Sequence, residues 1–270
     1  MCSILEIKNK SYYSWKSRKP SKRDKENALI LNKIKEIRED KKKECYGSPK
    51  IRLELITSGL KYNHKRIARI MSENAIFAKI KRKHRAKNQG GEKKDIAPNL
   101  LNRNFKPSAS NKIWTSDITY ISTHSGWVYQ CSVMDLYAKK ILAWEVSTSP
   151  NTELVIKAFQ KAIKRRNPRS GLMVHSDQGC QYTSDRYITF LKNHHFIQSM
   201  SRRGNCWDNA CIESFFGHLK NEWLCDFKFQ SIIEVKSALF EYIDGFYNTK
   251  RFHAGNGNLP PDEYEKIAHN

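Results

Sequence analysis

The order of hydrophobic and polar positions separates a helical first part of the chain from a later part that contains strands. Past residue 112, three consecutive runs have the alternation or the length typical of strands, and two short apolar runs follow later, each after a helical segment. The five predicted strands are IWTSDITYI (113–121), WVYQCSVMD (127–135), KILAWEVS (140–147), LMVHSD (172–177) and FIQSMS (196–201). Helical spacing over 151–166 and 184–195 places one helix before each of the last two strands. The pattern predicts a mixed α/β core in which three antiparallel strands precede alternating helices and strands.

The first part of the chain shows helical spacing, and its outward positions are basic. Residues 22–44 carry isoleucines along one edge, and residues 46–87 are predicted to form paired helices, the second capped by Asn63. That second helix turns its apolar residues inward and three basic residues outward, namely Lys65, Arg66 and Arg69. A helix, a short turn and a basic helix are typical of helix-turn-helix DNA readers. A basic helical spacer that binds phosphate without reading bases is the alternative.

Three acidic residues occupy positions from which they can converge. Asp117 lies in the middle of the first predicted strand, Asp177 ends the fourth, and Glu213 stands at the edge of the apolar stripe of a helix. The same helical projection turns Glu222 toward solvent. Carboxylate oxygens suit Mg²⁺, and two such ions can stabilise both the attacking and the leaving oxygen of a phosphodiester. A single acid in a strand or a helix is usually solvated or paired, so it is the combination that predicts a metal-carboxylate site.

Charge and cysteine usage narrow the class of protein. The formal net charge of the 270 residues is +22, of which residues 1–110 contribute +19. A basic front half joined to a nearly neutral rear half indicates a nucleic-acid-binding arm on a catalytic body. No apolar run approaches the ~18 residues of a membrane-spanning helix, and no signal-peptide pattern opens the chain. The seven cysteines are scattered without CxxC spacing, which favours reduced thiols in a cytoplasm over disulfides or a zinc module.

The acids and the sequence around them resemble those of a known family. Asp117, Asp177 and Glu213, with thirty-five residues between the last two and Lys220 seven beyond the glutamate, resemble the DDE core of retroviral integrases and bacterial insertion-sequence transposases. The segments IWTSDITYIS, VHSDQGCQYTS, SRRGNCWDNACIESFFGHLKNEW and YNTKRFH are similar to the integrase-like product of the insertion-sequence family numbered three. That family divides its transposase between two overlapping reading frames. The chain resembles the downstream product over essentially its whole length.

Pattern and resemblance together imply a ribonuclease-H-like catalytic core of the retroviral integrase type behind an all-helical, helix-turn-helix-like basic region. The expected domains are a basic helical segment (1–45), the helix-turn-helix-like module (46–87), a linker (88–110), the catalytic core (111–227), and a C-terminal helix and tail packed on the core (228–270). The resemblance implies that Asp117, Asp177 and Glu213 are catalytic acids that bind two Mg²⁺ ions, with Mn²⁺ as a substitute. The residues expected to contact DNA are Lys65, Arg66, Arg69, Arg202, Arg203 and Lys220.

The implied function is that of a DNA transposase, a polynucleotidyl transferase that cuts the ends of an insertion sequence and joins them to target DNA without a covalent protein intermediate. Its expected partners are the terminal repeats of the element, target DNA, further copies of the chain and an upstream-frame product, with no membrane. Its expected location is the bacterial cytoplasm, at the nucleoid. Two alternatives remain open: a nuclease on the same fold would hydrolyse DNA without joining it, and a non-catalytic regulator would only bind.

Overall fold

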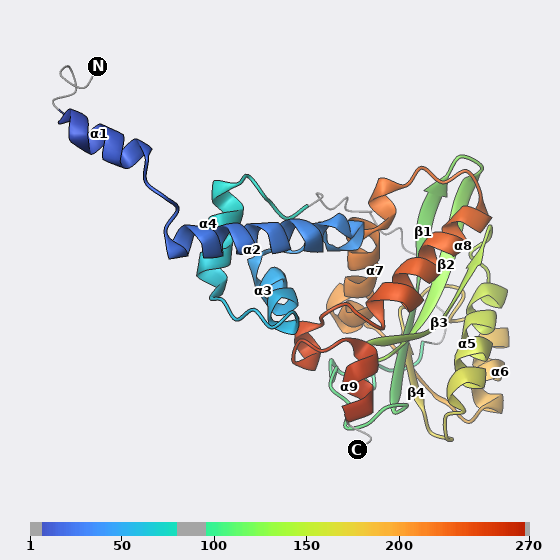
Figure 1. Cartoon of the computed structure of the whole chain (residues 1–270). Coiled ribbons are helices and arrows are strands. Elements are labelled where there is room, and N and C mark those ends of the chain that lie inside the picture. Colours follow the sequence, from blue (N-terminus) through green and yellow to red (C-terminus); the bar gives the residue numbers. More distant parts are fainter. Residues whose placement is uncertain (1–6, 80–95, 268–270) are drawn as a thin grey trace. The chain divides into compact units, whose positions relative to one another are not determined.

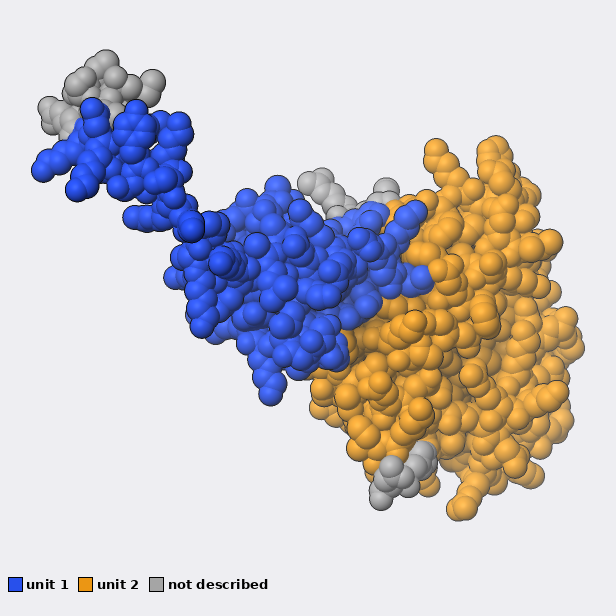
Figure 2. Space-filling model, viewed as in Figure 1, with its two compact units in different colours: residues 1–80 blue, residues 81–270 orange. Residues whose placement is uncertain are grey.

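The computed structural model describes residues 7–79 and 96–267, and the chain divides into two compact units, residues 1–80 and 81–270 (Figure 2). In its described part the first unit is helical. Its elements are α1 (Asn9–Lys16), α2 (Lys22–Glu39), the short 3-10 turn η1 (Lys41–Lys43), α3 (Ser48–Thr57) and α4 (His64–Glu73). Throughout the described ranges, no helix has both the length and the apolar character needed to cross a membrane.

Helices α2, α3 and α4 share one small hydrophobic core. Its fully buried side chains come from all three helices and from the turn before α3: Ile30, Ile34, Tyr46, Ile51, Leu55 and Ile67. Helix α4 begins where the sequence indicates, because the Asn63 side chain accepts a hydrogen bond from the backbone N–H of Lys65 at 2.9 Å. The helix buries its apolar stripe and leaves Lys65 and Arg69 exposed, as predicted.

The second unit is built on a five-stranded sheet (Figure 1). Its strands are β1 (Ile113–Thr123), β2 (Gly126–Asp135), β3 (Lys140–Ser147), β4 (Met173–Ser176) and β5 (Ile197–Met200). Their order in the sheet is β3-β2-β1-β4-β5. The pairs β1–β2 and β2–β3 are antiparallel, whereas β1–β4 and β4–β5 are parallel. All five strands lie where the sequence predicts them, and their order is that of the ribonuclease-H-like fold.

Helices alternate with the last two strands and then continue to the end of the chain. The longer ones are α5 (Thr152–Arg166), α6 (Asp185–Asn193), α7 (Ala210–Glu222), α8 (Ile232–Tyr242) and α9 (Pro261–Ile267). Short helical turns lie between them: η2 (Cys206–Asn209), η3 (Leu224–Asp226), η4 (Ile243–Tyr247) and η5 (Ala254–Asn256). Helix α5 is capped by Asn151, whose side chain accepts a hydrogen bond from the backbone N–H of Leu154 at 3.0 Å.

The two faces of β1 pack against different helices. Trp114 is fully buried in the main core together with Phe159 of α5. Because side chains alternate along a strand, Thr115 and Asp117 lie on the opposite face. There the Thr115 hydroxyl donates a hydrogen bond of 2.6 Å to the side-chain oxygen of Asn209, directly ahead of α7. The face that carries Asp117 is therefore the face on which α7 begins.

Candidate active site

Asp117 lies on β1 at the point where one edge of the strand becomes open. Strand β2 pairs with β1 over residues 114–123, whereas among the described strands β4 pairs with it over residues 113–115 and no further. The Asp117 side chain is half-buried, and its Oδ1 accepts a hydrogen bond from the backbone N–H of Ile118 at 2.7 Å. The carboxylate is thus held by a rigid strand and lies beside an unpaired strand edge.

The sheet register brings Asp177 to the same level as Asp117. Thr115 of β1 is the partner of His175 of β4, and the two strands are parallel. Asp117 and Asp177 each follow that pair by two residues, so the two carboxylates emerge from neighbouring strands side by side. The Oδ1 atom of Asp177 accepts the backbone N–H of Gly179 at 3.0 Å. A β-carbon at position 179 would approach that oxygen to 3.0 Å, so the glycine leaves room for the carboxylate.

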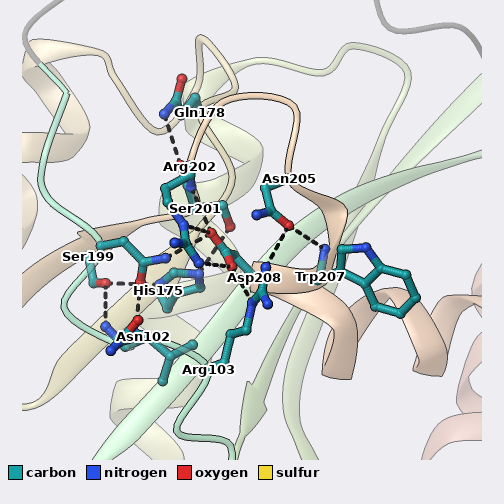
Figure 3. A network of polar contacts seen from close by, with 12 residues as sticks. Asn102, Arg103, His175, Gln178, Ser199, Ser201, Arg202, Asn205, Trp207 and Asp208 are labelled. Carbon is teal, nitrogen blue, oxygen red and sulfur yellow. Dashed lines mark hydrogen bonds and ion pairs between the residues drawn. The ribbon is translucent and has the colours of Figure 1, made fainter.

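A buried histidine fixes the end of β4 just before Asp177. The ring of His175 has no exposed surface, and it lies between two hydroxyl groups of the neighbouring segment (Figure 3). Its Nδ1 is 2.9 Å from the Ser199 hydroxyl and its Nε2 is 3.1 Å from the Ser201 hydroxyl. Burial lowers the pKa of His175 to about 4, so the ring is neutral at neutral pH. It therefore holds β4 against β5 without adding charge next to the acids.

Glu213 reaches the site from the first turn of α7. The helix is anchored by buried apolar side chains on the next stripe, namely Ile212, Phe215, Phe216 and Leu219. Glu213 itself is exposed, as its position at the edge of that stripe predicts. The hydrogen bond between Asn209 and Thr115 fastens the start of the helix to β1. Glu213 is thus carried by a helix whose first turn is tied to the strand of Asp117.

The three acids influence one another electrostatically. Burial raises the pKa of Asp117 well above its ordinary value, and the negative charges of Asp177 and then Glu213 raise it further. Burial also raises the pKa of Asp177. Lys220 of α7 opposes these effects, because its ammonium lowers the pKa of Asp117. The acids predicted from sequence therefore interact, with Lys220 as the cation beside Asp117.

This donor set suits a hard divalent cation. All three side chains offer carboxylate oxygens, which Mg²⁺ and Mn²⁺ prefer, and a cation among them would relieve the repulsion that raises the Asp117 pKa. Within residues 7–79 and 96–267, no three acidic, histidine or cysteine side chains are already gathered closely enough to hold a metal ion. The chain thus presents the charge and the ligand type of a metal site, without a closed cage.

A buried aspartate organises the loop that leads into α7 (Figure 3). Asp208 has a fully buried side chain and accepts hydrogen bonds from two guanidinium groups, those of Arg202 at 2.9 Å and Arg103 at 2.8 Å. The hydrogen bonds from Arg202 hold the pKa of Asp208 far below its ordinary range. Both arginines remain about half exposed, while the neighbouring Arg203 is exposed. As DNA contacts, Arg202 and Arg203 stay predictions, and Arg202 has in addition a structural partner that sequence reasoning missed.

The basic residues predicted on α4 differ in their partners within the first unit. Lys65 is exposed. Arg66 bonds to Glu26 at 3.0 Å and to the side-chain oxygen of Asn27 at 2.8 Å, both on α2. Arg69 forms an ion pair of 3.7 Å with Glu73, one turn along the same helix. Their DNA contacts remain predictions, and Arg66 also ties α4 to α2.

The helical projection that turned Glu222 toward solvent is wrong. Glu222 is buried at the last turn of α7, where Arg251 donates two hydrogen bonds to its carboxylate, at 2.6 and 2.7 Å. The Tyr242 hydroxyl donates another at 2.7 Å. In the sequence, the partner of Glu222 is visible only as an arginine in the segment YNTKRFH, and no helical pattern connects that arginine with Glu222. The C-terminal segment therefore fastens the far end of the helix that carries Glu213.

Comparison with known proteins agrees with both units. Residues 107–206 and 213–268 match two family models described as integrase core domain, and residues 24–84 match one described as HTH-like domain. A transposase for insertion sequence element IS904 of Lactococcus lactis is 38% identical over 92% of the chain and 98% of the relative. The InsF transposase for insertion sequence IS3A of Escherichia coli is 32% identical over 98% of the chain and 92% of the relative. The solved catalytic core domain of HTLV-2 integrase is 16% identical, covering 59% of the chain and 99% of that domain, with a TM-score of 0.47.

Proposed function

The chain belongs to the IS3 family of insertion-sequence transposases, and from this premise we propose that Asp117, Asp177 and Glu213 are the acids with which it cuts and joins DNA. The observation that carries the proposal is the register of β1 and β4. Asp117 and Asp177 each lie two residues beyond the paired residues Thr115 and His175, on the face where α7 brings Glu213. An acid on a strand, an acid directly after a strand and an acid on a tethered helix are placed with the rigidity that phosphoryl transfer requires.

The three carboxylates would hold two divalent cations, Mg²⁺ with Mn²⁺ as a substitute. When bound, such ions stabilise the attacking and the leaving oxygen of a phosphodiester displacement. The remaining tasks belong to side chains of the protein. Asp117 would hold such a cation from the central strand of the sheet, because its own carboxylate repels the negatively charged phosphate. Lys220 presents a half-buried ammonium beside Asp117 and would neutralise a phosphate oxygen of the DNA as it approaches the acids.

The proposed reaction has two displacements at phosphorus. In the first, a water oxygen bonds to phosphorus and the bond to the 3′ oxygen breaks, which releases a 3′-hydroxyl at the end of the element. In the second, that hydroxyl oxygen attacks a phosphodiester of the target DNA, and a target 3′ oxygen leaves. No bond to the protein forms in either displacement. The energy of one phosphodiester is conserved in the next during joining, so no nucleoside triphosphate enters the scheme.

The basic first part of the chain would supply the hold on DNA. We assign the DNA-binding module to residues 46–87, with a preceding helical segment at 1–45, a linker at 88–110, the catalytic core at 111–227 and a packed tail at 228–270. Within these ranges, residues 1–6, 80–95 and 268–270 lie outside the described residues. Lys65 of α4 is a candidate phosphate contact of the module, since its side chain is exposed. Partners would be the terminal repeats, target DNA, other copies of the chain and an upstream-frame product, acting at the nucleoid in the cytoplasm.

The test is a joining assay with purified protein, labelled element-end DNA, a target plasmid and MgCl₂. The Asp117→Asn, Asp177→Asn and Glu213→Gln variants should each lose joined and cleaved products while still binding the labelled DNA. Glu263→Gln is the matched control, because Glu263 is an exposed glutamate in the first turn of another helix, α9. Full activity in any of the three acid variants would refute the assignment. Cleavage without joining by the parent chain would favour a nuclease, and binding alone a regulator.

A further inference from the structure

Two exposed aromatic side chains form a pair on the β1–β2 hairpin, and neither has a role in the reaction proposed for the three acids. Tyr120 of β1 is 46% exposed and Trp127 of β2 is 53% exposed. Their ring centroids are 5.3 Å apart and the rings are nearly perpendicular, at 86°. In the register of the hairpin Tyr120 faces Tyr129 and Trp127 faces Ser122, so the pair is a diagonal one across the two strands. Such a contact stabilises a hairpin, but it does not require two large rings to remain half exposed to water.

Lys220 connects this pair with the acids. Its ammonium lies 4.5 Å from the centre of the Tyr120 ring, and the same ammonium lowers the pKa of Asp117. Between Tyr120 and Asp117 one edge of β1 is open, because among the described strands β4 pairs with β1 only as far as Thr115. A phosphate drawn to Lys220 therefore comes next to Asp117 on one side and next to the aromatic pair on the other.

The hairpin that carries the pair is fastened to the rest of the unit. The Thr123 hydroxyl donates to the carbonyl of Gly126 at 2.8 Å. The backbone N–H of His124 donates to the carbonyl of Phe229 at 2.8 Å, and the Ser125 hydroxyl donates to the carbonyl of Gln230 at 2.6 Å. The rings are consequently presented from a braced turn, and a partner that binds them loses little entropy in ordering the protein.

We infer that the Trp127 indole stacks on an unpaired nucleobase of the DNA, next to the phosphate that meets Lys220, and that Tyr120 holds both the indole and the ammonium in place. The location of that phosphate rests on the proposed function. A polyanion is favoured over an apolar protein surface because the Lys220 ammonium lies over the Tyr120 ring, where it can meet a phosphate. The base is unpaired because bases inside a duplex have both faces covered, whereas a frayed or single-stranded base offers a face to an aromatic ring.

The test compares two fluorescein-labelled DNAs in EDTA, a blunt duplex and the same duplex with a short single-stranded 3′ tail, by fluorescence anisotropy. The parent chain should bind the tailed DNA more tightly than the blunt DNA. Trp127→Ala should weaken binding of the tailed DNA by about five- to 150-fold and of the blunt DNA by less than about twofold. Trp127→Phe, which keeps a stacking ring, should lose less. Phe240→Ala is the matched control, because Phe240 is an exposed aromatic residue on α8 and should change neither affinity.

A second readout places the base directly. 2-Aminopurine in the tail should be quenched by the parent chain and by Asp117→Asn, and should remain bright with Trp127→Ala. The inference would be overturned if Trp127→Ala lost the same affinity for tailed and blunt DNA, or lost none. It would also be overturned if Trp127→Ala bound DNA normally but formed a smaller assembly, because the pair would then belong to a protein interface. Thermal melting identifies a variant that fails to fold. If Trp127→Ala does not fold, the comparison of tailed with blunt DNA is made with Trp127→Phe. The binding assay in EDTA measures stacking without DNA cleavage or joining. A failure of the stacking inference can therefore be distinguished from a failure of the proposed joining activity.

Discussion

Replacement of Arg251 by methionine is expected to destabilise the second unit severely. Arg251 and Glu222 are both buried, and the guanidinium supplies two of the hydrogen bonds to the carboxylate, at 2.6 and 2.7 Å. Without the arginine, Glu222 keeps a negative charge in a buried position. Removing one member of a buried ion pair costs about 3–5 kcal/mol. That is a large share of the about 5–15 kcal/mol that keeps a typical domain folded.

The assay is urea unfolding followed by tryptophan fluorescence. Five of the six tryptophans of the chain lie in the second unit, so the signal reports mainly on its unfolding. The control is Lys157→Met on α5, which removes an exposed lysine that is 3.8 Å from Glu153. An exposed pair of this kind contributes less than about 0.5 kcal/mol. The two substitutions delete the same charge from the same unit, so the difference between them measures what the buried, hydrogen-bonded setting of Arg251 adds.

The double variant Glu222→Leu with Arg251→Met separates a lost contact from a stranded charge. Leucine and methionine leave no buried charge, so the double variant should recover at least half of the stability lost by Arg251→Met alone. A cost of less than about 1 kcal/mol for the single variant would show that the Glu222 charge is not confined by burial. A double variant as unstable as the single one would show that the arginine stabilises by its volume rather than by its charge.

Three shorter predictions concern the surroundings of the acids. Gly179→Ala should reduce strand transfer by about tenfold or more with DNA binding unchanged, because the new β-carbon would lie 3.0 Å from the Asp177 carboxylate. Gly217→Ala is the control and should be tolerated, because the space at its β-carbon is open. Equal joining rates in the two variants would contradict this reasoning. Asp208→Asn should lower the melting temperature at neutral pH. The pKa of Asp208 is depressed in the folded chain, so its stabilisation is present above the ordinary value of 3.8 and is lost as the pH falls below it; a difference from the parent that stays constant from pH 6 into strong acid would contradict the ion-pair explanation. DNA affinity should fall linearly with the logarithm of salt concentration, and Lys65→Ala should make that slope shallower by about one unit if the exposed lysine meets a phosphate; an unchanged slope would remove Lys65 from the DNA contacts.

The strands were predictable because the signal that specifies them is local. Alternation over 113–121 predicts the first strand, and β1 is found at Ile113–Thr123. It extends further because pairing with β2 continues to the turn. The fourth strand is predicted to end at Asp177 but ends at Ser176, where its pairing with β5 stops. Errors of this size arise because a strand end is decided by the neighbouring strand, which a pattern along one segment does not contain.

The ion pairs were not predictable for the same reason. A helical projection of residues 210–222 assigns Glu222 to the solvent side, since it considers one helix in isolation. The partner that buries it, Arg251, arrives 29 positions later along the chain. Asp208 likewise obtains its two guanidinium partners from Arg103, far upstream, and from Arg202 in its own loop. A charged residue that is to be buried gives no local signal of its own, because part of its environment is supplied by segments distant in sequence.

The proposed acids and their supports differ in how far the sequence can reveal them. Phosphoryl transfer with divalent ions demands carboxylates, so chemistry restricts the candidates to a few residue types and spacing then selects among them. The supports face no such restriction. His175 behind Asp177 and Asn209 ahead of Glu213 satisfy buried hydrogen bonds that several other residue types could also make. Each is nonetheless costly to leave unpaired, so the chain is committed to the particular partners that its fold provides. The acids can therefore be inferred from sequence, whereas the side chains that hold them at a common level become visible once the strands are paired.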